Sequence, residues 1–181
     1  MLSPIKINKN QNKELAAQMH RYQKHIDKLE ERKAAPLAPR QNGLLNCLII
    51  DIDGTLAKRS NRGVYDFNKS IDDILVEPVN NIIGATLDTT ISPQIILITG
   101  REECHREVTE AWLKKHNVYY DELYMRRTGD RRRSDIVKEE IYLANVRGKW
   151  NVWFCIDDRI QDVLMYRSHG LYVLVADNSR E

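Results

Sequence analysis

The amino-acid sequence predicts an α/β protein, a Rossmann-like three-layer sandwich with a central parallel sheet, preceded by an N-terminal helical extension. Two observations indicate this fold class. Between residues 44 and 176 several runs are almost entirely apolar, as expected for parallel strands that are covered on both faces. Segments of helical composition separate these runs, and repeated strand–helix units favour a parallel sheet with helices on both sides.

The apolar runs predict the strands of this sheet, and the segments between them predict its helices. Strands are expected at residues 44–52, 94–99, 152–156 and 171–176, with a short additional strand at 118–125. Helices are expected at residues 70–86, 102–116, 134–145 and 159–169. Ligands of such sheets bind at the carboxyl ends of the strands, so the residues that follow each strand are the first candidates for a functional site.

The composition is that of a soluble globular protein, with 42% hydrophobic and 30% charged residues among 181. No apolar run approaches the roughly 18 residues that cross a bilayer, and the first residues lack the apolar core of a signal peptide. Cys47 and Cys155 lie in apolar runs, and neither forms a C-x-x-C spacing with Cys104, which favours buried thiols over disulfides or zinc ligands. We therefore expect a cytoplasmic protein without a membrane partner.

Residues 1–42 are predicted to form a basic helical arm and a proline-containing linker, and residues 43–181 the globular domain. The arm carries nine Lys or Arg residues against four Asp or Glu residues. Its residues 12–33 predict one helix, whose apolar residues recur with the spacing of a coiled-coil seam: Leu15, Met19, Tyr22, Ile26 and Leu29. This seam predicts a homo-oligomer formed through the arm, and a helix that docks on the domain is the alternative.

Three of the predicted strands are followed directly by polar residues. These are Asp51-Ile52-Asp53-Gly54-Thr55, Thr99-Gly100-Arg101 and Asp157-Asp158-Arg159. Lys138 lies on the helix before the last of these strands and can reach the same edge of the sheet. Carboxylates gathered with cationic side chains indicate a divalent cation and a phosphate, because each neutralises charges that would otherwise repel. Taken singly, such residues are also common as turn residues, helix caps or solvated lysines.

In their order along the chain, these residues resemble the signature motifs of the haloacid dehalogenase-like (HAD-like) phosphatases over roughly residues 44–176. The resemblance implies that Asp51 attacks phosphorus as the nucleophile and that Asp53 acts as general acid and base. Thr99 and Lys138 match the groups that bind the phosphoryl oxygens in this family. An aspartate at the second position of the D-x-D motif favours a phosphatase over a dehalogenase.

The same resemblance implies Mg²⁺ as the cofactor. By match, the ion is held by Asp51, by the backbone carbonyl of Asp53 and by Asp157, with water and phosphate oxygens completing its coordination. Asp158 is expected to bind the ion through water or to orient Lys138. These assignments come from the family's motif positions.

The intervals between the motifs leave little room for a separate cap domain. From Asp53 to Thr99, and again from Arg101 to Asp157, the chain is nearly filled by the predicted helices and short strands. We therefore expect a minimal cap or none, and an open site suits a large substrate. Residues 126–133 contain five arginines, which suit phosphodiester backbones, although a solvated charged loop is the alternative.

A closer resemblance is to the 3′-phosphatase domain of phage-type polynucleotide kinase-phosphatases. It is carried by the runs DIDGTLA, RGVYD, ITGRE, GDRRRSDIVKEEIY and IDDR. By position it implies four further active-site or substrate-binding residues: Arg62, Arg101, Arg126 and Asp135. Members of that family often carry a kinase with a G-x-x-x-x-G-K-[ST] loop, which this sequence lacks, so 5′-kinase activity is not predicted.

The leading hypothesis is a Mg²⁺-dependent polynucleotide 3′-phosphatase that acts on nucleic-acid ends through an aspartyl phosphate, in the host cytoplasm if the protein is phage-encoded. One alternative is a HAD-type phosphatase of free nucleotides or another small phosphomonoester. Another is a non-catalytic module that binds nucleic-acid ends. The sequence leaves open RNA against DNA, single strand against duplex, the acceptance of 2′,3′-cyclic ends and the size of an oligomer.

Overall fold

The computed structural model describes residues 34–88 and 90–176. The predicted helix at residues 12–33 and the self-association through its seam lie outside the described residues and stay predictions. The segment that precedes the sheet is hydrogen-bonded to the domain, because the backbone N–H of Ala35 donates to the carbonyl of Arg167 at 3.0 Å. The N–H of Ala38 donates to the carbonyl of Gly170 at 2.9 Å.

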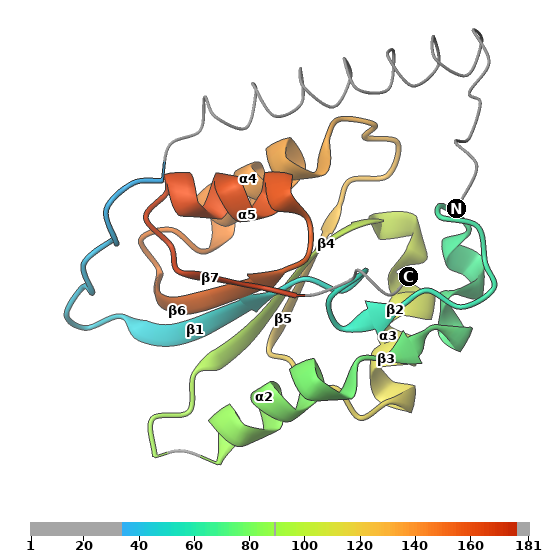
Figure 1. The fold of residues 1–181 in the computed structure, drawn as a ribbon, viewed down its shortest axis with the longest axis horizontal. Coiled ribbons are helices and arrows are strands. Elements are labelled where there is room, and N and C mark those ends of the chain that lie inside the picture. Colours follow the sequence, from blue (N-terminus) through green and yellow to red (C-terminus); the bar gives the residue numbers. More distant parts are fainter. Residues whose placement is uncertain (1–33, 89, 177–181) are drawn as a thin grey trace, which may run out of the picture. The chain divides into compact units, whose positions relative to one another are not determined.

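Five parallel strands form the central sheet in the order β5–β4–β1–β6–β7 (Figure 1). The strands are β1 (Leu45–Ile50), β4 (Gln94–Glu102), β5 (Glu122–Arg126), β6 (Trp150–Asp157) and β7 (Val173–Val175). The order places β1 in the middle of the sheet, between β4 and β6. The strand ends that carry the polar motifs therefore come from three adjacent strands.

Helices cover both faces of the sheet (Figure 1). Alternate residues of β1 enter two separate cores: Leu48 and Ile50 contribute to one, and Cys47 and Ile49 to the other. The first core contains residues of α2 (Glu77–Leu87) and α3 (Arg106–Lys115). The second contains residues of α4 (Ser134–Asn145) and α5 (Ile160–Ser168). This arrangement confirms the predicted three-layer sandwich.

The segment between β1 and β4 differs from the prediction of one helix at residues 70–86. It forms a short 3₁₀-helix, η1 (Phe67–Asp72), and a strand β3 (Ile74–Leu75) that pairs antiparallel with β2 (Ala57–Lys58) before α2 begins. Asp73 ends η1 with an extended backbone, and a proline in the first turn of α2 favours a helix start there. The described residues 34–88 and 90–176 form one compact unit, and they contain no separate cap domain.

The remaining elements lie close to their predicted positions. The helix expected at residues 102–116 is a 3₁₀ turn, η2 (Glu103–His105), followed by α3, because β4 extends to Glu102. Cys47 and Cys155 are buried and free, as expected, and Cys104 is exposed. Among the helices of residues 34–88 and 90–176, none combines the length and apolar character that a membrane span requires.

Candidate active site

A tight turn at the end of β1 presents Asp51 and Asp53. The N–H of Gly54 donates to the carbonyl of Ala57 at 2.9 Å, and the N–H of Ala57 donates to the carbonyl of Ile52 at 2.7 Å. Gly54 has a φ of +89°, which glycine adopts most readily. A Cβ at this position would clash with the carboxylate of Asp158, so glycine also allows that carboxylate to approach the turn.

Lys138 lies at the centre of a buried group that we call the lysine cluster: Lys138, Asp51, Asp157 and Asp162. Its Nζ donates hydrogen bonds to Asp51 Oδ1 and Asp157 Oδ2, both at 2.7 Å. The same atom forms an ion pair with Asp162 Oδ2 at 3.0 Å. The structure thus joins the ends of β1 and β6 to α4 and α5 through one ammonium group.

The carboxylates of Asp51, Asp157 and Asp158 fit a divalent cation. One oxygen from each lies within 4.8 Å of the others. Oxygen ligands are those that Mg²⁺ prefers, and one or two carboxylates with waters and phosphate oxygens complete its usual coordination. The structure therefore places three of the predicted metal ligands together. Asp158 Oδ1 also accepts a hydrogen bond from the Thr55 hydroxyl at 3.4 Å.

Burial controls the protonation of this cluster. Desolvation raises the pKa of Asp51 well above its ordinary value against the opposing effect of Lys138, and Asp157 and Asp158 add to the rise. Desolvation likewise raises the pKa of Asp157 to about 6. For Lys138, burial alone lowers the pKa, but the carboxylates of Asp157, Asp162 and Asp51 outweigh it and raise the pKa well above its ordinary value. One charged ammonium thus faces more carboxylates than it can neutralise.

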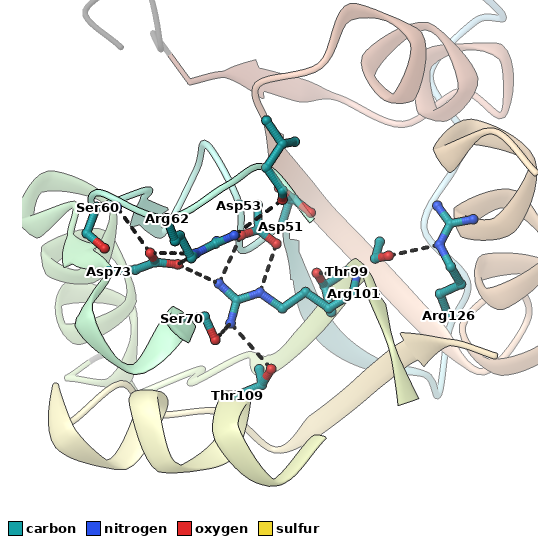
Figure 2. A network of polar contacts seen from close by, with 12 residues as sticks. Asp51, Asp53, Ser60, Arg62, Ser70, Asp73, Thr99, Arg101, Thr109 and Arg126 are labelled. Carbon is teal, nitrogen blue, oxygen red and sulfur yellow. Dashed lines mark hydrogen bonds and ion pairs between the residues drawn. The ribbon is translucent and has the colours of Figure 1, made fainter. Parts of the chain in front are cut away.

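Asp53 belongs to a second group, the arginine cluster: Arg62, Arg101, Asp53 and Asp73 (Figure 2). Asp53 Oδ1 accepts hydrogen bonds from Arg62 Nη2 at 3.0 Å and from Arg101 Nη2 at 2.9 Å. Its Oδ2 accepts one from Arg101 Nε at 2.9 Å. A carboxylate oxygen can accept two hydrogen bonds, so among the described residues one acceptor position remains, on Oδ2.

Asp73 fixes both arginines from the inner side of this cluster. Its side chain is fully buried, and it accepts from Arg62 Nε and Nη2 and from Arg101 Nη2, the last at 3.2 Å. Arg101 Nη1 donates to the hydroxyls of Ser70 and Thr109 at 3.2 and 3.3 Å, so all five N–H groups of Arg101 have acceptors within the protein. Arg101 therefore has no N–H group left for a ligand in this structure, and it acts on the site only by holding Asp53.

The end of β4 explains how Arg101 enters this cluster. The pairing of β4 with β5 is interrupted between Thr99 and Glu102, and this irregularity contains Gly100 and Arg101. The backbone N–H of Arg101 donates to the Thr99 hydroxyl oxygen at 3.2 Å. Thr99 is fully buried, and among the described residues it does not line the cavity.

Arg126 and Asp135 stabilise the arginine-rich loop before α4. Arg126 Nε donates to the carbonyl of Gly100 at 2.8 Å, and its Nη1 donates to the carbonyls of Asp130 and Arg132. Asp135 accepts two hydrogen bonds from Arg133, both at 3.0 Å. The structure thus brings Arg126 to the cavity wall and pairs the buried carboxylate of Asp135 with the exposed Arg133 at the start of α4.

A cavity of about 650 Å³ opens over both clusters. Six basic and four acidic side chains line it, together with one tyrosine, two small residues and no aliphatic side chain among the described residues. The lining residues are Asp51, Asp53, Tyr65, Gly100, Glu102, Arg126, Asp130, Arg131, Arg132, Arg133, Ser134, Lys138 and Arg159. Such a lining suits an anionic ligand better than an apolar one.

The sequence of residues 45–179 matches the family described as the polynucleotide kinase PNKP phosphatase domain, which covers most of the chain. The chain belongs to this family. Membership agrees with the resemblance carried by the D-x-D motif and the arginine-containing runs. The PNKP phosphatase fold therefore provides the frame in which the two clusters are assembled.

Solved structures and a viral protein resemble this PNKP phosphatase domain. A chain of the Pnkp1/Rnl/Hen1 RNA repair complex is 35% identical with a TM-score of 0.73, over 77% of this chain and 44% of that chain. A protein of Autographa californica nuclear polyhedrosis virus, named as a bifunctional polynucleotide kinase/RNA ligase, is 28% identical over 66% of this chain and 17% of its own length. The HAD domain of the effector Lem4 from Legionella pneumophila shares the fold, at 12% identity and a TM-score of 0.51 over 76% of this chain and 88% of that chain. This chain thus spans less than half the length of the first two relatives.

Sequence reasoning missed two residues of this PNKP phosphatase site, Asp73 and Asp162. Asp73 stands beside the exposed Asp72, and nothing in the local pattern tells which of the two turns inward. Asp162 has a detectable signal, since it shares the buried side of α5 with Val163 and Tyr166. An acidic residue on the apolar side of a helix requires a buried partner, and here the partner is Lys138.

Proposed function

We propose that this protein is a Mg²⁺-dependent polynucleotide 3′-phosphatase that works through an aspartyl phosphate on Asp51. The main support for this proposal is one observation: Asp51, Lys138 and two further carboxylates lie together beneath a cavity lined with arginines. The chain that carries them is a member of the PNKP phosphatase family. Family membership supports phosphate-ester chemistry, and the cavity supports an anionic substrate.

In the first step an oxygen of Asp51 forms a bond to phosphorus while the bond from phosphorus to the 3′ oxygen breaks. Asp51 attacks in its ionised form and therefore needs no general base; Lys138 and a bound cation would favour this form against the burial that raises the pKa of Asp51. Lys138 lies 2.7 Å from the attacking carboxylate and stabilises the charge that develops on the phosphoryl oxygens. Asp53 gives its proton to the leaving 3′ oxygen, which becomes a hydroxyl group.

In the second step a water molecule attacks the phosphorus of the aspartyl phosphate and transfers a proton to Asp53. The bond between Asp51 and phosphorus breaks, and inorganic phosphate leaves. Arg62 and Arg101 hold Asp53 so that one acceptor position on Oδ2 remains for this proton. Asp53 is about one-third exposed in the cavity, whereas both arginine side chains are buried.

The chain's own carboxylates would hold the cofactor: Asp51, Asp157 and Asp158 offer the ligand atoms. When bound, Mg²⁺ supplies positive charge that offsets the repulsion between these carboxylates and a phosphate dianion. By family match alone Thr99 stays a proposed phosphoryl-binding residue, since its side chain is fully buried and is not part of the cavity lining within the described residues.

The lining of the cavity supports a polynucleotide substrate. Tyr65 is 86% exposed at the cavity and offers an aromatic surface on which a base can stack. Arg131 and Arg159 are exposed and lie at the same cavity, where guanidinium groups suit phosphodiesters. Because one relative belongs to an RNA repair complex and another is named as a polynucleotide kinase/RNA ligase, we propose RNA ends as the first substrate to test.

The direct test measures phosphate released from 3′-phosphorylated RNA and DNA oligonucleotides, with Mg²⁺ and with EDTA. We expect the oligonucleotides to be turned over at higher kcat/KM than a nucleoside 3′-monophosphate or an aryl phosphate. D51N should abolish turnover, and D72N, which changes an exposed aspartate near the arginine cluster, serves as the matched control. Turnover by D51N near the wild-type level would refute the mechanism, and equal kcat/KM for all substrates would refute the polynucleotide assignment.

A further inference from the structure

The lysine cluster contains one carboxylate that the proposed chemistry does not use. Asp162 lies in the first turn of α5 and is fully buried. Its Oδ2 is 3.0 Å from Lys138 Nζ and accepts a hydrogen bond from the Ser134 hydroxyl at 2.9 Å. Among the described residues, Asp162 is not one of the carboxylates whose oxygens can share a metal ion. Its contacts therefore serve the lysine and not the cation.

A buried carboxylate of this kind is costly to keep. Its second oxygen, Oδ1, has no hydrogen-bond partner within the described residues. A buried polar atom without a hydrogen-bond partner destabilises a fold, because it has lost its contacts with water and gained none in the protein. Packing alone would be served better by a neutral side chain of the same shape, so the charge of Asp162 calls for an explanation.

The explanation lies in the neighbouring carboxylates, each of which binds Lys138 and also has a second function in the proposed mechanism. Asp51 must attack phosphorus, and Asp51 and Asp157 both belong to the group that can hold a cation. Each of them shares an oxygen with Lys138 in the present structure. When Asp51 attacks phosphorus or Asp157 binds the cation, Lys138 loses a hydrogen bond. Asp162 takes part in neither event, so its contact with Lys138 remains.

We propose that Asp162 is a positioning residue that holds the Lys138 ammonium in place while Asp51 and Asp157 engage the phosphoryl group and the cation. Ser134, at the start of α4, fixes the carboxylate through its hydroxyl. With Asp162 as a fixed anchor, Lys138 can turn a remaining N–H toward a phosphoryl oxygen without swinging out of the cluster. This inference rests on the proposed phosphoryl transfer to Asp51 but not on the polynucleotide specificity.

A purely structural role is the competing explanation, because an acidic residue in the first turn of a helix is favourable by itself. The two explanations differ in what they predict for catalysis. A helix-stabilising aspartate affects the melting temperature and leaves kcat unchanged in the folded protein. A positioning residue affects kcat more than KM, since the contact to the phosphoryl group strengthens in the transition state.

The test compares D162N with Y166F in the full chain. D162N keeps the shape and the acceptor for Ser134 but removes the charge. Tyr166 lies one turn further along α5, equally buried, with a hydroxyl that has no partner among the described residues, so Y166F is the matched control. Turnover of p-nitrophenyl phosphate gives kcat and KM, and calorimetry with Mg²⁺ gives the affinities for orthovanadate and for inorganic phosphate. Thermal melting of the metal-free proteins shows that each variant is folded.

We expect D162N to lower kcat on the order of 10- to 100-fold with little change in KM. It should weaken orthovanadate, which resembles the transition state, more than inorganic phosphate. A folded D162N with the kcat and vanadate affinity of Y166F would overturn the proposal. If D162N does not fold, S134A decides: a several-fold loss of kcat supports the proposal, and kcat equal to that of Y166F overturns it.

Comparing the two substrates, p-nitrophenyl phosphate and 3′-phosphorylated oligonucleotides, distinguishes a failure of this inference from a failure of the proposed function. Wild-type protein that hydrolyses p-nitrophenyl phosphate but not 3′-phosphorylated oligonucleotides would end the polynucleotide assignment. The comparison of D162N with Y166F would stand unchanged, because both its readouts use the phosphoryl site alone.

Discussion

The lysine cluster and the arginine cluster meet at the D-x-D motif but are built in opposite ways. Asp51 belongs to the first and Asp53 to the second. The lysine cluster sets one ammonium among three carboxylates, all of them buried. The arginine cluster sets two guanidinium groups against two carboxylates, and its charges balance without any added ion.

This difference indicates how the two halves of the site work. Buried carboxylates whose charges are not neutralised raise the free energy of the fold, and binding of a cation between them removes this repulsion. A balanced cluster whose N–H donors are all used gains nothing from an added ion and keeps one geometry. The lysine cluster is therefore suited to receive a cation and a phosphoryl group, and the arginine cluster to fix Asp53, the proposed acid–base residue.

Removal of Mg²⁺ should have the largest effect, because the carboxylates of the lysine cluster would then repel the phosphoryl group without the positive charge that offsets them. We expect EDTA to reduce turnover below detection and Mg²⁺ to restore it. At a concentration about 100 times the dissociation constant, Mg²⁺ should stabilise the wild type by about 2.7 kcal/mol and raise Tm by about 5–10 °C. Melting curves check this, and D157N should show little of the shift. An equal shift in D157N would place the ion elsewhere.

The pH dependence of that stabilisation follows from Asp157. Its pKa of about 6 in the fold lies above the ordinary value of 3.8, chiefly through burial. Its protonation therefore stabilises the metal-free fold fully below about pH 3.8, and this contribution is lost as the pH rises through about 6. Protons and Mg²⁺ compete for the same oxygens, so the Mg²⁺-induced rise in Tm should be larger at pH 7.5 than at pH 5.5. A shift independent of pH would count against Asp157 as a ligand.

R101K should have the next largest effect, since lysine cannot reproduce the forked contacts of arginine. Arg101 donates two hydrogen bonds to Asp53 and one to Asp73. Without them Asp53 loses its orientation, and we expect kcat to fall by about 100-fold, within the range that general acid–base catalysis contributes. Steady-state kinetics on a 3′-phosphorylated oligonucleotide and on p-nitrophenyl phosphate give the measurement.

A double-mutant cycle tells whether Arg101 acts through Asp53 or on the substrate. If it acts through Asp53, the R101K substitution should change kcat little in a D53N background. If Arg101 binds the substrate directly, its loss should remain as large in D53N as in the wild type. The second result would contradict the arrangement in which all five N–H groups of Arg101 stay within the protein.

Much of this architecture is visible in the sequence because strands and strand ends have strong local signatures. The apolar run before Asp51 predicted β1, and the helix expected at residues 134–145 coincides with α4. The D-x-D motif, Lys138 and Asp157 were identified from their positions after or between strands, and the structure brings them together. Their convergence follows from the parallel sheet, whose strand ends share one edge.

What the sequence did not reveal depends on contacts between distant segments. The helix expected at residues 70–86 was wrong in its first turns, because pairing of β2 with β3 and the ion pairs of Asp73 outweigh local helix propensity. The arginines of residues 126–133 look alike in sequence, yet Arg126, Arg132 and Arg133 are held by internal hydrogen bonds. Only the folded arrangement separates these from Arg131.

D73N should have a moderate effect, because it weakens the inner anchor of the arginine cluster and leaves Asp53 in place. Asparagine can accept from only one of its two side-chain groups, so Arg62 and Arg101 lose part of their shared partner. We expect kcat to fall about tenfold, which corresponds to about 1.4 kcal/mol in the transition state. Kinetics of D73N beside the D72N control check this, and a D73N variant as active as D72N would show that Asp53 suffices to hold both arginines.

R131A should have the smallest effect and tests the cavity lining. Arg131 is exposed at the cavity, and within the described residues its guanidinium has no hydrogen bond or ion pair. If it contacts a phosphodiester of the substrate strand, R131A should raise KM for a 3′-phosphorylated oligonucleotide several-fold and leave p-nitrophenyl phosphate unchanged. The slope of log K against log salt should decrease in magnitude by about 0.7–0.9, the contribution of one phosphate contact.

The control for R131A is R127A, which removes an exposed arginine of the same loop that does not line the cavity among the described residues. Both variants lose one positive charge, so a general electrostatic attraction would lower oligonucleotide affinity equally in the two. A specific contact instead predicts a larger rise of KM in R131A than in R127A. Equal effects would indicate that the arginines of this loop attract the polyanionic substrate only at long range. Tyr65 and Arg159 would then be the remaining candidates for direct contact with the strand.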